Sequence, residues 1–211
     1  MKFTALCLAA LLTETGTAAT IITETFSMNA SVVIPDADLA GVVQTITPGT
    51  SLASLDRVTV TLVTSGGWNG DLYAYLWHDG VLSVLLNRPG RSVARPDGAA
   101  IVGMSVELAD AAGTDIHLAP GAFSGSFQPD GRDVHSSVAL DTSPRNDSLA
   151  DFVSTAPDGA WRLFIADVAG GEEATLVSWS ISLTGPQAVP EPGGGLLTGV
   201  ALCCLLRRRR K

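Results

Sequence analysis

The chain is poor in cysteine and lysine, and both residue types are confined to its ends. Among 211 residues there are three cysteines (Cys7, Cys203, Cys204) and two lysines (Lys2, Lys211). The middle of the chain therefore has no thiol for a disulfide, a thiolate metal site or a cysteine nucleophile. A domain built from this middle must be held together by core packing or by bound ions.

Positive charge is also scarce. Residues 20–188 contain seven cations, all arginine, against 19 acidic residues, which gives a net charge of −12. Such an acidic domain repels phosphate backbones and anionic lipid surfaces. Nucleic acid is therefore excluded as a partner. Helical periodicity is nearly absent as well, which argues against an α-helical fold.

The N-terminus has the order of a secretory signal peptide. Lys2 is followed by an apolar run, residues 3–12, and then by small residues that end at Ala18 and Ala19. Ten apolar residues are too few to span a bilayer stably. We therefore expect residues 1–19 to direct export and to be cleaved after Ala19, with cleavage after Ala18 as the alternative.

The C-terminus combines a proline-rich motif, an apolar run and a basic end. Its 14-residue apolar run, 193–206, would form roughly 21 Å of helix, short of the hydrocarbon core of about 30 Å. Terminal cations stay on the cytoplasmic side of a membrane. The motif is Val189, Pro190, Glu191 and Pro192, and the basic end includes Arg207, Arg208, Arg209 and Arg210.

This order resembles the bacterial PEP-CTERM sorting signal, which an exosortase-type membrane enzyme processes. The resemblance implies that residues 187–211 are a sorting signal with a short transmembrane run. We expect the secretion machinery to export the chain and the inner membrane to anchor it transiently. The mature protein is then expected at the cell surface or outside the cell.

The middle of the chain alternates apolar and polar residues with a period of two. The clearest case is 177–184, where Val177, Trp179, Ile181 and Leu183 alternate with hydroxyl residues. Segments 58–62, 72–77, 81–86 and 161–165 are further predicted strands, and turn sequences such as His78-Asp79-Gly80 separate them. Short strands near 101–108 and 123–127 lie within a loop-rich stretch, 88–151. The pattern predicts an all-β sandwich of about eight or more strands.

Three segments carry a family resemblance. They are Ile34-Pro35-Asp36, Gly70-Asp71-Leu72, and an ending in which Gly159-Ala160-Trp161-Arg162-Leu163 is followed by Asp167 and Trp179-Ser180. They resemble the P domain (P/Homo B) of subtilisin-like proprotein convertases. The resemblance implies a jelly-roll β-sandwich over residues 20–186.

The same resemblance does not bring catalytic residues with it. In convertases the P domain follows a subtilisin-type serine endopeptidase domain, whereas here we expect only a signal peptide before it. The histidines of the middle, His78, His117 and His135, are predicted to lie in turns or at the surface. The neighbouring hydroxyls of Ser136 and Ser137 are predicted to lie in a solvated loop. We therefore expect no enzyme activity and no catalytic residue.

Calcium is the cofactor that this composition favours. It takes oxygen ligands from Asp side chains and loop carbonyls, and it is abundant outside cells. The alternative is that these residues are ordinary turn formers, as predicted for Asp130 and Asp158. The candidate ligands at predicted strand ends and loops are Asp36, Asp38, Asp71, Asp110 and Asp115.

A row of aromatic residues offers a second kind of site. Tyr73, Tyr75 and Trp77 fall on the strand face opposite Leu72 and Leu76. They would form a stacking platform for polysaccharide if that face is open. The alternative is a strand buried on both faces. Trp161 and Trp179, on regular apolar faces, are predicted core residues.

Three functions remain open at this point. The leading hypothesis is an exported, non-catalytic P-domain-like module at the cell surface or in the extracellular matrix. The second is a carbohydrate-binding or matrix-binding module that uses the aromatic row, with exopolysaccharide as its partner. The third is an accessory subunit that stabilises a separate subtilisin-like serine endopeptidase.

Overall fold

The computed structural model describes residues 19–119 and 121–189. The predicted signal peptide up to Ala18 and the sorting signal from Pro190 onward lie outside the described residues. Within the described residues, no helix is both long enough and apolar enough to cross a membrane.

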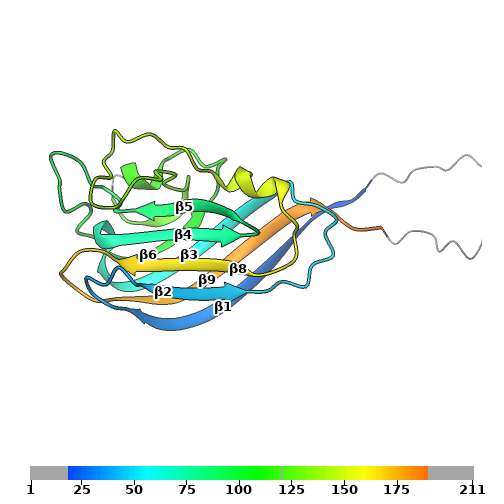
Figure 1. Ribbon diagram of the computed structural model, residues 1–211, viewed down its shortest axis with the longest axis horizontal. Helices are drawn as coiled ribbons and strands as arrows, with labels where there is room; N and C mark the ends of the chain where they lie inside the picture. The colour runs from blue at the N-terminus through cyan, green and yellow to red at the C-terminus, as the bar shows by residue number, and fades with distance from the viewer. Residues whose placement is uncertain (1–18, 120, 190–211) are drawn as a thin grey trace, which may run out of the picture.

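The domain is a sandwich of two β-sheets (Figure 1). The five-stranded sheet has the order β1 (Ile21–Ile34), β9 (Ala174–Pro186), β3 (Arg57–Trp68), β6 (Val102–Leu108) and β7 (Ser124–Phe127). The four-stranded sheet has the order β2 (Val42–Ile46), β8 (Trp161–Asp167), β4 (Leu72–His78) and β5 (Val81–Asn87). Three short 3₁₀ helices complete the described elements: η1 (Asn69–Asp71), η2 (Ile116–Leu118) and η3 (Leu149–Ser154). The predicted all-β sandwich is confirmed.

The strand pairing is that of a jelly roll. Strand β1 pairs with β9, β2 with β8, β3 with β6 and β4 with β5, all antiparallel, so the chain forms one long hairpin with its tip at β4 and β5. Rolling this hairpin up places β9 beside β3 and β8 beside β4. Strand β7 is an addition that pairs parallel to β6 at the sheet edge.

The core lies between the sheets and is built from the alternating apolar residues. Trp161 and Trp179 are 0% and 1% exposed, which confirms their predicted place in the core. Strand β9 differs from the prediction at its start. A bulge shifts the register between Ser178 and Leu176, so Leu176 is buried and Val177 is only half-buried.

The β4–β5 hairpin turns tightly at two residues. Asp79 and Gly80 have φ angles of 47° and 83°, the positive values that a type I′ turn requires. His78 was predicted as part of this turn. It is instead the last residue of β4, and its ring packs inward.

The loop-rich stretch between β5 and β8 is anchored by a buried ionic network. Asp130, fully buried, accepts hydrogen bonds from His117 at 2.8 Å and from Arg132 at 3.1 Å. Arg132 also forms an ion pair with Asp115 at 2.9 Å. The prediction that Asp130 is a plain turn residue is therefore wrong, because its carboxylate is the centre of this network.

Candidate functional site

The two outer faces of the sandwich differ in chemistry. The five-stranded sheet presents mainly hydroxyl side chains, such as Thr59 and Thr61 of β3 and Ser180 and Ser182 of β9. The four-stranded sheet presents aromatic side chains instead, because the outward positions of β4 are Tyr73, Tyr75 and Trp77. Exposed aromatic surface of this kind marks interaction sites more often than scattered apolar residues do.

The aromatic residues come from two neighbouring strands. Tyr75 of β4 lies opposite Phe164 of β8, and their rings stack with centroids 4.8 Å apart and planes 14° apart. The Tyr73 ring meets both of them edge-on, at 6.0 Å from Tyr75 and 6.2 Å from Phe164. The result is an aromatic group whose three rings pack against one another.

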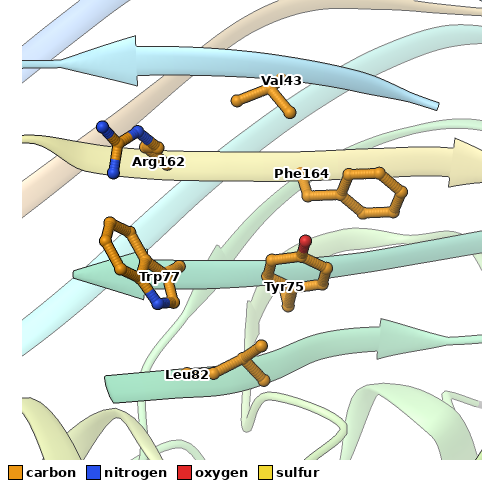
Figure 2. Close-up of a pocket in the computed structure, with 6 residues that line it drawn as sticks. All are labelled: Val43, Tyr75, Trp77, Leu82, Arg162 and Phe164. Atoms are coloured by element: carbon orange, nitrogen blue, oxygen red, sulfur yellow. The ribbon is translucent and has the colours of Figure 1, made fainter. Parts of the chain in front are cut away.

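A hollow of about 390 Å³ lies over the stacked rings of Tyr75 and Phe164 (Figure 2). Its volume is at the small end of the range for small-molecule sites. Trp77 stands at one end of the hollow, and the Arg162 guanidinium lies 4.7 Å from the centre of its ring. Figure 2 shows the six side chains rising from four adjacent strands on the same side of the sheet. The lining residues are Val43, Tyr75, Trp77, Leu82, Arg162 and Phe164.

The structure decides between the two interpretations of the aromatic row. Strand β4 is not buried on both faces. Its inward residues are buried, whereas Tyr73, Tyr75 and Trp77 are half-buried on the outer face of the sheet. Sequence reasoning missed Arg162 and Phe164 as parts of this face. Their signal was present, since they occupy the outward positions of β8 on either side of buried Leu163.

A second group of polar residues lies where β4 begins and β8 ends. Asp71 and Asp167 are 2% and 0% exposed, and one carboxylate oxygen (Oδ2) of each has no hydrogen-bond partner among the described residues. Asp36 lies at the same end, where its Oδ1 accepts a hydrogen bond from the Gly171 amide at 3.0 Å. Asp36, Asp71 and Asp167 are thus neighbours in space, and we name these three residues the carboxylate cluster.

Burial and mutual repulsion disfavour charge in this cluster. Burial and, to a smaller extent, the nearby carboxylates of Asp71 and Asp36 together raise the pKa of Asp167 to about 6, against two backbone hydrogen bonds that lower it. Burial also raises the pKa of Asp71, although Arg88 opposes this with an ion pair at 3.4 Å. A bound cation would relieve the repulsion and would pair with the Oδ2 atoms of Asp71 and Asp167, which lack a hydrogen-bond partner among the described residues.

The five predicted calcium ligands do not converge. Asp38 accepts a hydrogen bond from the Ala40 amide within its own turn. Asp110 caps the start of η3 by accepting hydrogen bonds from two backbone amides. Asp115 is paired with Arg132. Only Asp36 and Asp71 of the predicted set lie in the carboxylate cluster, and no three metal-binding side chains are grouped closely enough for a metal site in the described part of the chain.

Two histidines are buried, contrary to prediction. His78 stacks on Trp161 with ring centroids 3.9 Å apart, and its nitrogens lie 3.1 and 2.7 Å from two backbone carbonyls. His117 is 1% exposed and lies between Asp130 and the Arg91 carbonyl. His135 is exposed and contacts the Ser137 hydroxyl at 2.8 Å, as predicted for a solvated loop.

No family model matches the chain, and no curated protein matches it in sequence. Among solved structures, the chain resembles the serine protease of Aeromonas sobria in complex with its chaperone ORF2 (17% identity, TM-score 0.46) and the same protease alone (15%, 0.46). The two alignments cover 80% and 82% of this chain, but only 28% of each matched chain. Dimeric latent PorU of Porphyromonas gingivalis is less similar, at 10% identity and a TM-score of 0.36, over 81% of this chain and 14% of PorU. At these scores the likenesses carry no argument about function.

Proposed function

We propose that this protein is an exported, non-catalytic binding module of the P-domain-like type, and that its ligand is extracellular polysaccharide. The observation that carries the proposal is the aromatic outer face of the four-stranded sheet, with its hollow over Tyr75, Trp77 and Phe164. The opposite sheet has no comparable aromatic group on the outer positions of its described strands.

The chemistry of this face suits sugar rings. A pyranose ring has an apolar side of C–H groups, which packs on an aromatic surface, and a rim of hydroxyls, which needs polar neighbours. Tyr75 offers a phenolic hydroxyl beside its ring, and Trp77 offers an indole N–H (Figure 2). Both side chains lie on a sheet, so stacking requires little ordering of the protein.

The chemistry of the described residues also supports a non-catalytic role. Residues 19–189 contain neither cysteine nor lysine. His78 and His117 make internal hydrogen bonds through both ring nitrogens. His135 contacts Ser137, but no carboxylate orients its ring through a hydrogen bond in the described part of the chain.

The export part of the proposal rests on the two ends of the sequence. The Val-Pro-Glu-Pro motif, the short apolar run and the arginine block stand in the order of a PEP-CTERM signal. An exosortase-type enzyme is therefore the proposed processing partner. The mature module is proposed to act at the cell surface or outside the cell, where exopolysaccharide is found.

Calcium is the proposed stabilising ion. Its proposed ligands are the Oδ2 atoms of Asp71 and Asp167, which have no hydrogen-bond partner among the described residues. Two buried carboxylates are fewer than a calcium ion needs, so loop carbonyls and water would complete the shell. Asp36 supplies further negative charge nearby. The ion would stabilise the domain without taking part in ligand binding.

Association with a subtilisin-like serine endopeptidase is the alternative function. It rests on the P-domain-like segments, and the aromatic residues of those segments, Trp161 and Trp179, lie in the core. They therefore account for the fold and provide no surface for a partner. Co-purification of the exported protein with such a protease would favour the alternative.

Binding of the purified protein to a panel of polysaccharides, measured by affinity electrophoresis, tests the proposal. We expect at least one polysaccharide to retard the protein, and we expect Trp77→Ala to lose this retardation. The stacking contacts of one aromatic side chain are worth about 1 kcal/mol. Trp68→Ala is the matched control, since Trp68 is 36% exposed on the other sheet. Equal retardation of Trp77→Ala and the unmodified protein would contradict the proposed site.

A further inference from the structure

Arg162 is an unpaired cation on the aromatic face of an acidic domain. Its side chain is exposed, and no carboxylate of the described residues lies within ion-pair distance of it. Four of the seven arginines of residues 20–188 (Arg88, Arg91, Arg132, Arg145) are instead tied to internal carboxylates or carbonyls. An unpaired arginine in such a domain is available for a ligand.

The position of the guanidinium is fixed by its neighbour. It lies over the Trp77 ring at 4.7 Å, so the cation–π contact holds it at the edge of the hollow. A stacked guanidinium keeps its N–H groups free at its edge, and this planar edge matches a carboxylate in a bidentate pair.

Charge is distributed unevenly along the face. At the end opposite Arg162, burial raises the pKa of the Tyr73 phenol, and the adjacent ring of Tyr75 and the carboxylates of Asp147 and Asp133 add to this effect. The negative charges of Asp147 and Asp133 make that end less favourable for an anion than the end beside Arg162. A ligand with a carboxylate would place it at the Trp77 end, beside Arg162, and its sugar ring over Tyr75 and Phe164.

We infer that the polysaccharide bound by this face carries carboxylate groups, as uronic acid residues do. This inference rests on the proposed function, since it assumes that the aromatic face binds saccharide. It adds that Arg162 is the specificity-determining residue, which selects an acidic sugar through a charge-assisted pair, whereas the aromatic rings bind acidic and neutral sugars alike.

The test compares polygalacturonate with the same polymer after its carboxyl groups are methyl-esterified, so that only the charge differs. Affinities of the purified protein for both probes are measured at about 0.15 M salt, which screens the net negative charge of the domain beyond about 8 Å, and with a chelator present, because uronates bind calcium. We expect polygalacturonate to bind about tenfold or more tightly than its ester. Arg162→Gln should remove this difference, and Arg162→Lys should restore only part of it.

Arg57→Gln is the matched control, because Arg57 is an exposed arginine of the five-stranded sheet and should leave the preference unchanged. If both probes bind with equal affinity and only Trp77→Ala abolishes this binding, the inference is overturned and the proposed function stands. Binding of neither probe by the unmodified protein would overturn the inference for uronates, whereas binding that Trp77→Ala does not weaken would overturn both.

Discussion

His117 is a buried histidine whose surroundings favour its charged form. Burial by itself would lower the pKa of His117, but its hydrogen bond with Asp130 and the charge of that carboxylate outweigh burial and hold the pKa above its ordinary value. The Arg91 carbonyl acts in the same direction, and Arg132 opposes it. His117 thus contributes stability as an imidazolium.

The free energy of unfolding should therefore depend on pH through His117. A group whose pKa is raised in the folded state stabilises it fully below the unfolded pKa of about 6.5 and loses this effect as the pH rises through the folded pKa. We expect the urea midpoint to fall as the pH rises above about 6.5, and the fall to be smaller in His117→Gln. His135→Gln, an exposed control, should keep the full slope. An unchanged slope in His117→Gln would show that the imidazolium is not the cause.

Asp167 tests the proposed calcium ion. If Asp71 and Asp167 bind it, calcium at one hundred times its dissociation constant should stabilise the domain by about 2.7 kcal/mol. The melting temperature should then exceed that in chelator by roughly 5–10 °C, and Asp167→Asn should abolish the difference. Asp158→Asn, in an exposed turn, is the control. Equal melting temperatures of the unmodified protein with calcium and with chelator would rule the ion out.

Among the elements, η1 joins β3 to β4 and fixes the loop before β6. Gly70 lies in η1, donates its amide to the Ala99 carbonyl at 3.0 Å, and leaves no room for a side chain. A Cβ at Gly70 would lie 2.4 Å from the Ala99 nitrogen and 2.7 Å from the Asp97 carbonyl oxygen. The glycine of the Gly-Asp-Leu segment is therefore required by a close approach of two backbones.

Gly70→Ala should destabilise the domain by about 1–3 kcal/mol, because the backbone of the 97–99 loop must move to admit the methyl group. Gly49→Ala should have almost no effect, since a Cβ there meets nothing within 4 Å. Urea denaturation of both variants measures the difference. Equal midpoints for the two variants would show that the loop yields without cost.

Local patterns predicted several elements well, and their limits have physical causes. Alternation found β4, β8 and most of β9, because one face of each strand is buried and the other is not. It misplaced Val177, since a bulge changes which residue points inward. Strand β1 was not predicted, although Phe26, Met28 and Ala30 alternate with polar residues; its outer edge is unpaired and its burial is partial.

At the scale of the whole molecule, the site depends on contacts between distant segments. The Tyr75–Phe164 stack needs the β4–β8 register, and the carboxylate cluster needs Asp36 from a turn, Asp71 from η1 and Asp167 from the end of β8. The buried place of His117 likewise depends on Asp130. No local pattern encodes these pairings. The sequence predicted Tyr73, Tyr75 and Trp77 as a row, but not the neighbours that complete the face.

The proposed export and sorting concern the whole molecule. The two described ends of the chain meet at one end of the sandwich, where the Gln187 amide donates a hydrogen bond to the Thr20 carbonyl at 2.8 Å (Figure 1).

We expect Pro190→Ala or Glu191→Ala to leave the chain unprocessed in the inner membrane, as cell fractionation would show. Substituting Gln187→Ala, just before the motif, is the control. Normal release of the Pro190 and Glu191 variants would contradict sorting through this motif.

The most direct measurement is a titration of the ¹⁵N-labelled protein with polysaccharide, followed through its four tryptophan indole N–H resonances. Trp77 lies in the proposed site, Trp161 and Trp179 are buried, and Trp68 is exposed on the other sheet. We expect the Trp77 resonance to shift with saturation while the other three stay in place. Saturable binding that shifts Trp68 and leaves Trp77 unmoved would contradict the aromatic face as the binding site.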